Sequence, residues 1–343
     1  MLHLNSKLLK YTKQGIYCPQ ADIYIDPWGN VDKAVITHGH SDHARRGAKK
    51  YLTHRITVPI IKHRLGSDIN TKPVEYGEVI SVNGVRISLV PAGHIPGSAQ
   101  VRLEHKGEVA VVSGDYKIED DGFSAAFEPV KCNTFVTEST FGLPIYKWKP
   151  QKEIAADINS WWKANKKKGF ASVLCGYSLG KAQRIIKMLD TRIGSIYTHG
   201  AVHSVNELLV KEGMILPETR LVTKEIAKSD FVGAMIIAPP SAMGSTWLNK
   251  FEPYSLGYAS GWMNVRGARR WQAIDIGFAL SDHADWPGLN DAIKNTGAES
   301  VYVTHGFTSV FVRWLKEQGI DAHELHTQFK GEQVGTDDGE AGN

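Results

Sequence analysis

The sequence predicts an α/β protein with two domains, and three observations support this expectation. The chain has 343 residues, of which 42% are hydrophobic and 22% charged, so it can bury more than one core. Short apolar runs at residues 34–37, 108–112 and 134–137 each lead into a loop with histidine or acidic side chains. Between residues 195 and 238, apolar runs alternate with a helical stretch, which is typical of a parallel sheet in an inserted domain.

Composition and charge argue against several classes of protein. No apolar run approaches the ~18 residues that a membrane span needs, and residues 1–7 lack the order of a signal peptide. We therefore expect a cytoplasmic protein with no membrane partner. The three cysteines, Cys18, Cys132 and Cys175, are far apart, which argues against disulfides and against a thiolate metal site. The formal net charge of +4 indicates only a mild preference for polyanions.

A dense group of metal-binding residue types follows the first apolar run. His38, His40, Asp42 and His43 lie within six residues. Because a strand directs alternate side chains to opposite faces, four such ligands can meet only on a loop that follows the strand. Imidazole and carboxylate together suit zinc, manganese or iron. A polar loop with incidental histidines is the alternative, and the density of ligand types favours a metal site.

Further candidates follow other expected strands. Asp26 ends a short strand and could support the metal site as a hydrogen-bond acceptor, although an Asp-Pro pair also opens turns. His94 lies on a loop rich in glycine and proline, where it is well placed to reach into a cleft. Asp115 and Glu138 each follow an apolar run, and for Asp115 an ordinary Gly-Asp turn is the alternative.

The pattern of an apolar strand followed by a histidine loop returns late in the chain. Strands expected at residues 273–280 and 300–303 lead to His283 and His305. The late strands are therefore expected to rejoin the first domain after an insertion. The expected divisions are a first domain of residues 1–147 and 262–330, an inserted domain of residues 148–261, and a disordered tail at 331–343.

Taken in order, these motifs resemble those of the metallo-β-lactamase superfamily. The H-x-H-x-D-H block is similar to its first motif, and the Glu-Ser-Thr-Phe-Gly string from Glu138 resembles the start of its β-CASP branch of nucleic-acid-cutting proteins. The resemblance implies an αβ/βα sandwich with an inserted α/β cap domain, and two divalent metal ions, zinc or manganese. It assigns His38, His40 and His94 to the first metal, Asp42, His43 and His305 to the second, Asp115 to both, and Asp26 to a supporting position.

The chain also resembles the bacterial ligase-associated DNA exonucleases, at residues 24–28 and 281–286. This resemblance implies a metal-dependent hydrolase that degrades DNA in repair, in functional association with a DNA ligase. The implied catalytic residues are Asp42, Asp115, Glu138 and His283. His283 would be the general acid at the leaving group, and Glu138 would hydrogen-bond its other ring nitrogen.

Two other functions stay open. Histidine at the last motif, here His305, is usual in RNA-cutting members of the branch, so a ribonuclease is the main alternative. A hydrolase of small esters or thioesters is the second alternative. The inserted domain and its basic runs argue against it.

Two stretches between residues 241 and 270 have side chains suited to phosphate. Ser241 and Ser245 lie on a loop before an expected helix start, whose backbone N–H groups could receive a phosphate, although an ordinary capped helix would look the same. Arg266, Arg269 and Arg270 lie near aromatic residues, a mixture that can contact phosphates and stack on bases, as a solvated basic loop also would.

Two other motifs of the inserted domain are expected to be structural. His199 and His203 are four residues apart but lack the glutamate of H-E-x-x-H, so we expect them to cap or pack a helix. The Gly-x-x-x-Gly-Lys string that ends at Lys181 is one residue too short for a phosphate-binding loop and lacks the following Ser or Thr.

Overall fold

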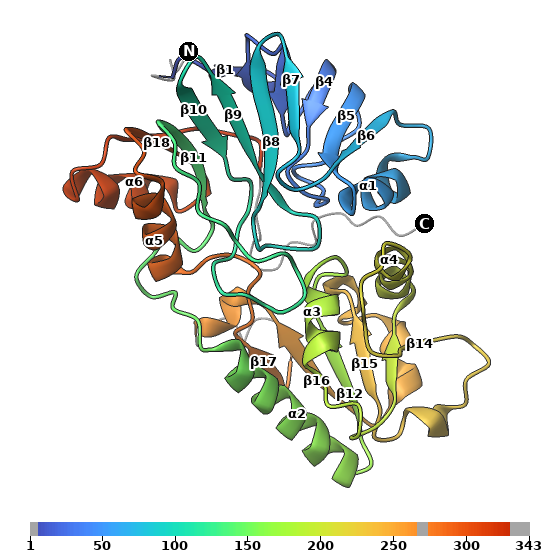
Figure 1. Ribbon diagram of the computed structural model, residues 1–343. Coiled ribbons are helices and arrows are strands. Elements are labelled where there is room, and N and C mark those ends of the chain that lie inside the picture. Colours follow the sequence, from blue (N-terminus) through green and yellow to red (C-terminus); the bar gives the residue numbers. More distant parts are fainter. Residues whose placement is uncertain (1–5, 266–273, 330–343) are drawn as a thin grey trace. The chain divides into compact units, whose positions relative to one another are not determined.

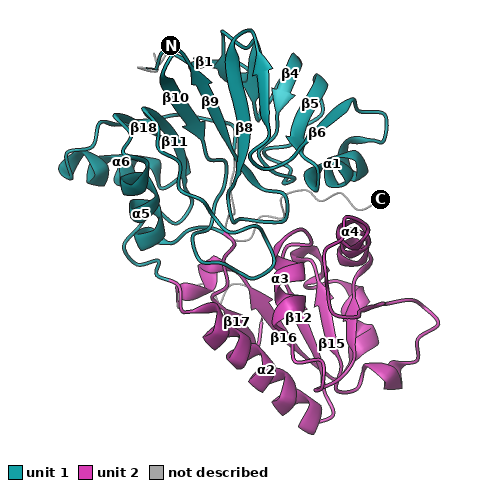
Figure 2. Cartoon of the chain, in the orientation of Figure 1, with its two compact units in different colours: residues 1–147, 283–333 teal, residues 148–282, 334–343 magenta. Residues whose placement is uncertain are grey.

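The computed structural model describes residues 6–265 and 274–329, and the chain divides into two compact units (Figure 2). Unit 1 comprises Met1–Lys147 and His283–Gln333, and unit 2 comprises Trp148–Asp282 and Val334–Asn343. The tail expected at 331–343 lies outside the described residues.

The expected return to the first domain at residue 262 is wrong. β17 (Ile276–Phe278) pairs in parallel with β16 (Tyr254–Ala259), which is a strand of the sheet of unit 2. Because these backbone hydrogen bonds bind β17 to that sheet, the chain leaves unit 2 only after Asp282. The strand expected at 273–280 is therefore shorter, at Ile276–Phe278, and belongs to unit 2 instead of unit 1.

Unit 1 contains two sheets of the three in the described chain (Figure 1). In the first sheet the strand order follows the sequence, with antiparallel pairing up to β3 and parallel pairing from β3 onward. Its strands are β1 (Lys10–Thr12), β2 (Gly15–Cys18), β3 (Ile23–Ile25), β4 (Val31–Val35), β5 (Ala48–His54) and β6 (Thr71–Val74).

The second sheet of unit 1 has the order β19-β18-β11-β10-β9-β8-β7. Its early strands form an antiparallel meander, and β10, β11, β18 and β19 run in parallel. Asn83 and Gly84 form the turn between β7 and β8 with φ values of 49° and 79°, as their Asn-Gly pair predicts. The strands are β7 (Val79–Val82), β8 (Val85–Pro91), β9 (Ala99–His105), β10 (Glu108–Val112), β11 (Thr134–Ser139), β18 (Ser300–Gly306) and β19 (Ala322–Glu324).

The two sheets of unit 1 pack face to face, and helices cover their outer faces. One buried cluster joins the sheets and includes Ile16 and Val35 from the first and Leu89 and Val101 from the second. A second cluster packs α5 (Trp286–Thr296) and α6 (Thr308–Glu317) against β11 and β18, as Figure 1 shows. A third packs α1 (Thr57–Leu65) against the first sheet. The layers are therefore helix, sheet, sheet, helix, which is an αβ/βα sandwich.

Unit 2 is a parallel sheet of order β14-β13-β15-β12-β16-β17. Its central strands are buried along their whole length, which explains why their sequences are continuous apolar runs. The strands not yet given are β12 (Ala171–Cys175), β13 (Ile196–Thr198), β14 (Arg220–Leu221) and β15 (Met235–Ala238).

Helices cover one face of this sheet and short 3-10 segments the other. α2 (Gln151–Lys167) buries Ile154, Ile158 and Trp162, which lie on one side of the helix, together with residues of α3 (Lys181–Met188) and α4 (Gly200–Lys211). The opposite face packs against Phe231, Leu248, Phe251 and Met263 from segments η1 (Lys228–Phe231), η3 (Thr246–Phe251) and η4 (Gly261–Asn264). Within residues 6–265 and 274–329, no helix has the length and apolar character needed to cross a bilayer.

Candidate metal centre

Loops and strand ends of unit 1 bring the expected ligands together. The histidine block follows β4, His94 follows β8, Asp115 follows β10, and Glu138 and His305 lie near the ends of β11 and β18. All are buried except the partly exposed His40. The side chains form four overlapping groups, each with ligand atoms within 4.8 Å of one another: His38, His40, His94 and Asp115; His38, Asp42 and His43; His43, Asp115 and His305; and Asp115, Glu138 and His283.

The carboxylate of Asp115 lies between two sets of imidazoles. Its Oδ2 is 3.5 Å from Nε2 of His38 and 3.8 Å from Nε2 of His94. Its Oδ1 is 2.9 Å from Nε2 of His305 and 3.5 Å from Nε2 of His43. Each oxygen therefore faces a different pair of histidines, which is the arrangement of a carboxylate that can bridge two cations.

The donor atoms fit divalent cations in type, spacing and burial. Two ligand atoms about 2.1 Å from a tetrahedral zinc lie about 3.4 Å apart, and the Nε2 of His38 and of His43 are each 3.5 Å from an Asp115 oxygen. Among the described residues, buried Nε2 atoms of His38, His43 and His305 and Oδ1 of Asp115 make no hydrogen bond. A buried polar atom without a partner costs about 1–3 kcal/mol, and a pair of cations, one on each side of Asp115, would satisfy all four.

Burial and the neighbouring charges shift the pKa values of the cluster. Burial alone would raise the pKa of Asp115, but His43 and His305 outweigh it and hold that pKa well below its ordinary value. Burial lowers the pKa of His38 well below its ordinary value, and His43 lowers it further. Asp115 is therefore an anion and His38 a neutral imidazole at neutral pH, which are the protonation states that bind a metal.

Asp26 forms hydrogen bonds with Thr37 and with the His43 ring of the cluster. Its Oδ1 accepts the backbone N–H of Thr37 at 2.8 Å, and its Oδ2 lies 2.6 Å from the Thr37 hydroxyl and 2.7 Å from Nδ1 of His43. The backbone of Asp26 has a φ of 44°, a left-handed conformation that is uncommon outside glycine and often occurs at functional sites. Asp26 is thus a hydrogen-bond acceptor at the position where the sequence led us to expect one.

A β-bulge directs Glu138 toward His283. The register between β11 and β18 shifts between Thr137 and Ser139, so Glu138 lies in the irregularity, and bulges of this kind redirect side chains next to active sites. Oε2 of Glu138 is 2.9 Å from Nδ1 of His283, and Oε1 accepts the backbone N–H of Tyr116 at 2.8 Å. The His283 ring lies 4.6 Å from the ring of His94, measured between centroids, so the pair adjoins the histidine cluster.

Sequence reasoning missed three residues that contact the cluster. The hydroxyls of Thr37 and Thr304 lie 3.0 Å and 3.1 Å from Nδ1 of the histidine that follows each of them. Phe329 stacks on the His43 ring at 4.3 Å and meets the His305 ring edge-on at 5.8 Å, so it covers these two histidines with an apolar surface. The repeated Thr-His-Gly tripeptide was a signal for the threonines, whereas nothing in the sequence marked Phe329.

The remaining candidates from the sequence belong to the inserted domain. Ser241 lies in a 3-10 segment, η2 (Pro240–Ala242), and the Ser245 hydroxyl donates to the carbonyl of Ala242. A helix start was expected after these serines, but the segment that follows Ser245 is a 3-10 helix and not an α-helix. Arg266, Arg269 and Arg270 lie outside the described residues. The capping role expected of His199 is confirmed, because its Nδ1 accepts the backbone N–H of Ala201 at the start of α4.

Comparison with known proteins gives matches to nucleic-acid enzymes and to solved structures. No protein-family model matches the chain. The chain is 27% identical over 310 residues to a probable DNA ligase of Opitutus terrae, covering 90% of this chain but only 30% of the ligase. It is 24% identical to the probable RNase MJ4 of Methanocaldococcus jannaschii, covering 85% and 86% of the two chains.

Two further matches are more limited. The endoribonuclease YSH1 of Saccharomyces cerevisiae is 30% identical over 119 residues, which is 34% of this chain and 15% of that protein. A crystal structure of a protein of unknown function from Enterococcus faecalis has a TM-score of 0.54 at 12% identity, covering 81% of this chain and 77% of that one. This last likeness concerns the fold alone.

The motif order from His38 to His305, the sandwich of unit 1 and the inserted parallel sheet of unit 2 occur together with these matches. In these features the chain is similar to the β-CASP proteins of the metallo-β-lactamase superfamily. The expected fold class, an αβ/βα sandwich with an inserted α/β unit, is confirmed.

Proposed function

We propose that this chain is a metal-dependent nuclease of the β-CASP branch that hydrolyses phosphodiester bonds, with DNA as its main substrate and exonucleolytic digestion as its mode. The observation that supports this most directly is the position of Asp115, whose two oxygens face two different pairs of histidines. The names of the relatives point the same way, since they describe a DNA ligase, an endoribonuclease and an RNase.

The proposed site holds two divalent cations, zinc or manganese. When bound, such a pair supplies Lewis acidity that polarises a phosphate and makes water acidic enough to attack it at neutral pH. His38, His40 and His94 would hold one cation, Asp42, His43 and His305 the other, and Asp115 both. Asp26 would keep the His43 ring in place through its hydrogen bond to Nδ1.

His283 is the proposed general acid. The leaving oxygen of a phosphodiester needs a proton, and a positioned imidazolium can provide it. Glu138 lies 2.9 Å from Nδ1 of His283 and is itself held by the Tyr116 N–H, so the carboxylate stabilises the charged ring and fixes its orientation. In this scheme Nε2 of His283 faces the leaving group.

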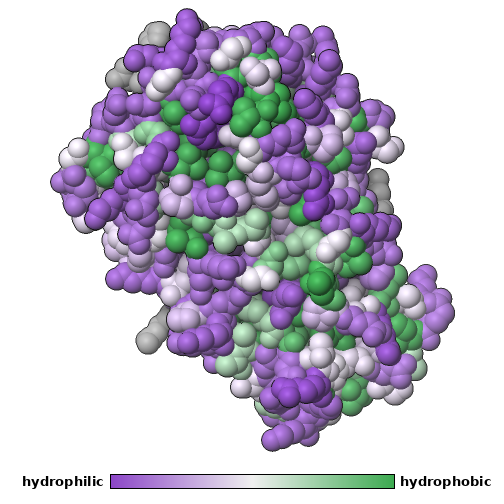
Figure 3. Space-filling view, in the orientation of Figure 1, coloured by the Kyte–Doolittle hydropathy of each residue, from purple (hydrophilic) through white to green (hydrophobic). Residues whose placement is uncertain are grey.

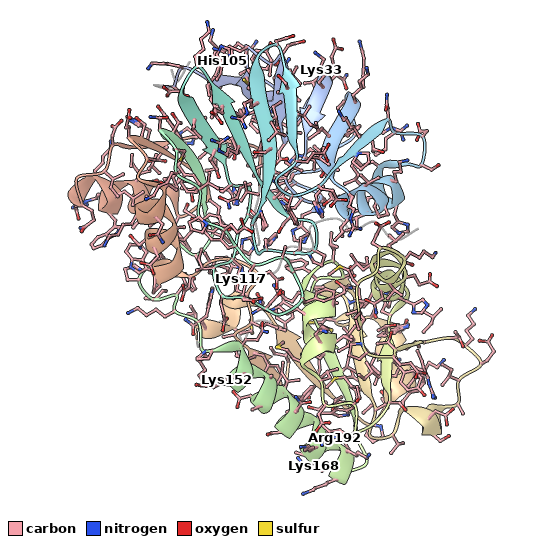
Figure 4. The ribbon with its side chains drawn as sticks, in the orientation of Figure 1. Lys33, His105, Lys117, Lys152, Lys168 and Arg192 are labelled. Atoms are coloured by element: carbon pink, nitrogen blue, oxygen red, sulfur yellow. The ribbon has the colours of Figure 1, made fainter. Side chains whose placement is uncertain are left out.

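A basic surface on unit 2 supports a polyanionic substrate over a small ester. Lys163, Lys166, Lys167 and Arg192 line a hollow of about 530 Å³ at the end of α2, with Lys168 next in the chain. Asp190 is the carboxylate that lines the same hollow, so the residues that line it have a surplus of three positive charges. Figure 4 shows Lys168 and Arg192 at the same end of unit 2, and Figure 3 shows that end as hydrophilic.

Charge reversal on this surface should weaken binding of nucleic acid. The slope of log affinity against log salt is negative, and each phosphate contact that is lost should reduce its magnitude by about 0.7–0.9. The variants are Lys168→Glu and Arg192→Glu, and the measurement is fluorescence anisotropy of a labelled strand over a salt series. Lys152→Glu is the matched control, because Lys152 is exposed at the opposite end of the same helix. Equal slopes in all three variants would remove this surface from substrate binding.

Association with a DNA ligase in repair is part of the proposal. The probable DNA ligase of Opitutus terrae is more than three times as long as its matching region, so a polypeptide with that name includes a segment similar to this chain. A nuclease that trims DNA ends would prepare them for joining. RNA remains the second candidate substrate, because two relatives are named as ribonucleases and His305 occupies the last motif.

Digestion of matched strands tests the proposed function. DNA and RNA oligonucleotides of one sequence, labelled at either end, are incubated with zinc, with manganese or with a chelator. We expect DNA to shorten progressively from an end in a metal-dependent way, while an Asp115→Ala preparation purified in parallel excludes a contaminating nuclease. Efficient RNA cutting with intact DNA would reverse the substrate assignment. Hydrolysis of aryl esters with both strands intact would overturn the nuclease proposal.

A further inference from the structure

A Thr-His pair occurs on each side of Asp115. Thr37 precedes His38 after β4, and Thr304 precedes His305 within β18. His38 faces one oxygen of Asp115 and His305 the other. In both pairs the threonine hydroxyl lies close to Nδ1 of the following ring, and all four residues are buried. Each of the two proposed cation sites therefore contains one histidine whose Nδ1 lies next to a threonine hydroxyl.

The hydroxyl of Thr37 has only one proton, and Asp26 takes it. Oγ1 of Thr37 is 2.6 Å from Oδ2 of Asp26, and an ionised carboxylate can only accept. Oγ1 is also 3.0 Å from Nδ1 of His38. Since the hydroxyl proton is already used, this second contact forms only if Nδ1 of His38 donates its own proton to Oγ1. The neutral ring then has its lone pair on Nε2, which is the atom that faces Asp115.

Thr304 produces the same result from a different acceptor. Its Oγ1 is 3.1 Å from the carbonyl oxygen of Thr137, which can only accept, so the hydroxyl proton is used there. Nδ1 of His305, 3.1 Å away, must therefore donate to Oγ1. In the neutral ring Nε2 then has the lone pair, and it lies 2.9 Å from Oδ1 of Asp115, so these two atoms can share one cation.

The sequence Thr-His-Gly alone does not produce this arrangement. A third copy occurs at residues 198–200 of unit 2, where Nδ1 of His199 accepts the N–H of Ala201. The Thr198 hydroxyl there donates to the carbonyl of Arg220 at 3.5 Å and has no contact with Nδ1 of His199 among those found for the described residues. The two copies near Asp115 thus differ from the third in their hydrogen bonds, and the third provides an internal control.

We propose that Thr37 and Thr304 are positioning residues that fix His38 and His305 in the tautomer with a bare Nε2, one for each cation site. The proposal rests on the two-cation function proposed above. The threonines touch neither cation nor substrate and act only through the rings. Residues with this kind of indirect role typically change metal affinity by about 10–100-fold when they are replaced.

Replacement by valine and by serine separates the hydrogen bond from the packing. Thr37→Val and Thr304→Val keep the branched shape and remove the hydroxyl, whereas Thr37→Ser and Thr304→Ser keep the hydroxyl. Zinc affinity is measured on the full chain by competition with a chromophoric chelator. We expect each valine variant to bind one of the two zinc ions about 10–100-fold more weakly, and each serine variant to stay within a few-fold of wild type. Thr198→Val should leave both affinities unchanged.

Nitrogen NMR of the metal-free wild-type chain, with 15N-labelled histidine and at a pH at which both rings are neutral, reads the tautomers directly. We expect a protonated Nδ1 and an unprotonated Nε2 for His38 and His305, and the reverse or a mixture in the valine variants. A protonated Nε2 on either ring in the wild type would overturn the inference, and so would valine variants that bind zinc as wild type does. A wild type that binds no zinc would instead contradict the proposed function.

Discussion

Replacing Asp115 with alanine should abolish phosphodiester cleavage, by more than about 10³-fold, because both proposed cations lose their shared ligand. Each oxygen of Asp115 faces a different pair of histidines, so no remaining side chain can take over both contacts. Metal content and cleavage rate are measured on the same preparation. Both should fall together.

Two controls separate loss of metal from loss of folding. Asp68→Ala removes an exposed carboxylate from the same unit and should leave metal content and cleavage unchanged. The far-UV circular dichroism of metal-free Asp115→Ala at low temperature should match that of the metal-free wild type. Its thermal midpoint should be lower, because the depressed pKa means that the fold stabilises the Asp115 anion at neutral pH. A variant that still binds two metals with full affinity would contradict the bridging role.

Replacing His283 with alanine should slow cleavage of DNA by about 10²–10⁴-fold, the usual contribution of a general acid, and should spare metal binding. The reason is that His283 is held by Glu138 and adjoins the histidine cluster without belonging to either pair around Asp115. Cleavage is measured at saturating metal, and metal content is measured in parallel. Loss of metal equal to that of Asp115→Ala would exclude the role of acid.

The choice of leaving group gives this prediction its sharpest control. A nitrophenyl phosphodiester releases a weakly basic phenolate that needs no proton, so His283→Ala should cleave it nearly as fast as the wild type does. Glu138→Gln should follow the same pattern with a smaller loss on DNA, because the amide still meets Nδ1 but no longer stabilises the charged ring. A similar loss on both substrates would indicate damage to the metal centre.

The grouping of the candidate ligands could be predicted from the sequence because their residue types are rare and their order is distinctive. His38 to His43 lie within one loop, and His94, Asp115 and His305 each follow an apolar strand, so the convergence of strand ends was enough to place them together. The position of Glu138 was predictable from the string around it. The bulge that directs it was not, because bulges depend on pairing with a strand about 165 residues later in the chain.

Other features depend on tertiary contacts that the sequence does not mark. Residues 276–278 are an apolar run that would fit a sheet of either unit, so only the pairing with β16 decides where the chain leaves unit 2. Thr37 and Thr304 look like ordinary β-branched residues next to strands. Phe329 is a single aromatic residue near a polar tail, and its stacking on His43 appears only in three dimensions.

The most direct test of the two-cation centre is the number and position of the metal ions in the wild-type chain. Elemental analysis after dialysis against zinc or manganese gives the number, and anomalous diffraction from crystals of the loaded protein gives the positions. We expect two ions per chain, one on each side of Asp115, with His38 beside one and His305 beside the other. One ion alone, or two ions that do not share Asp115, would contradict this expectation.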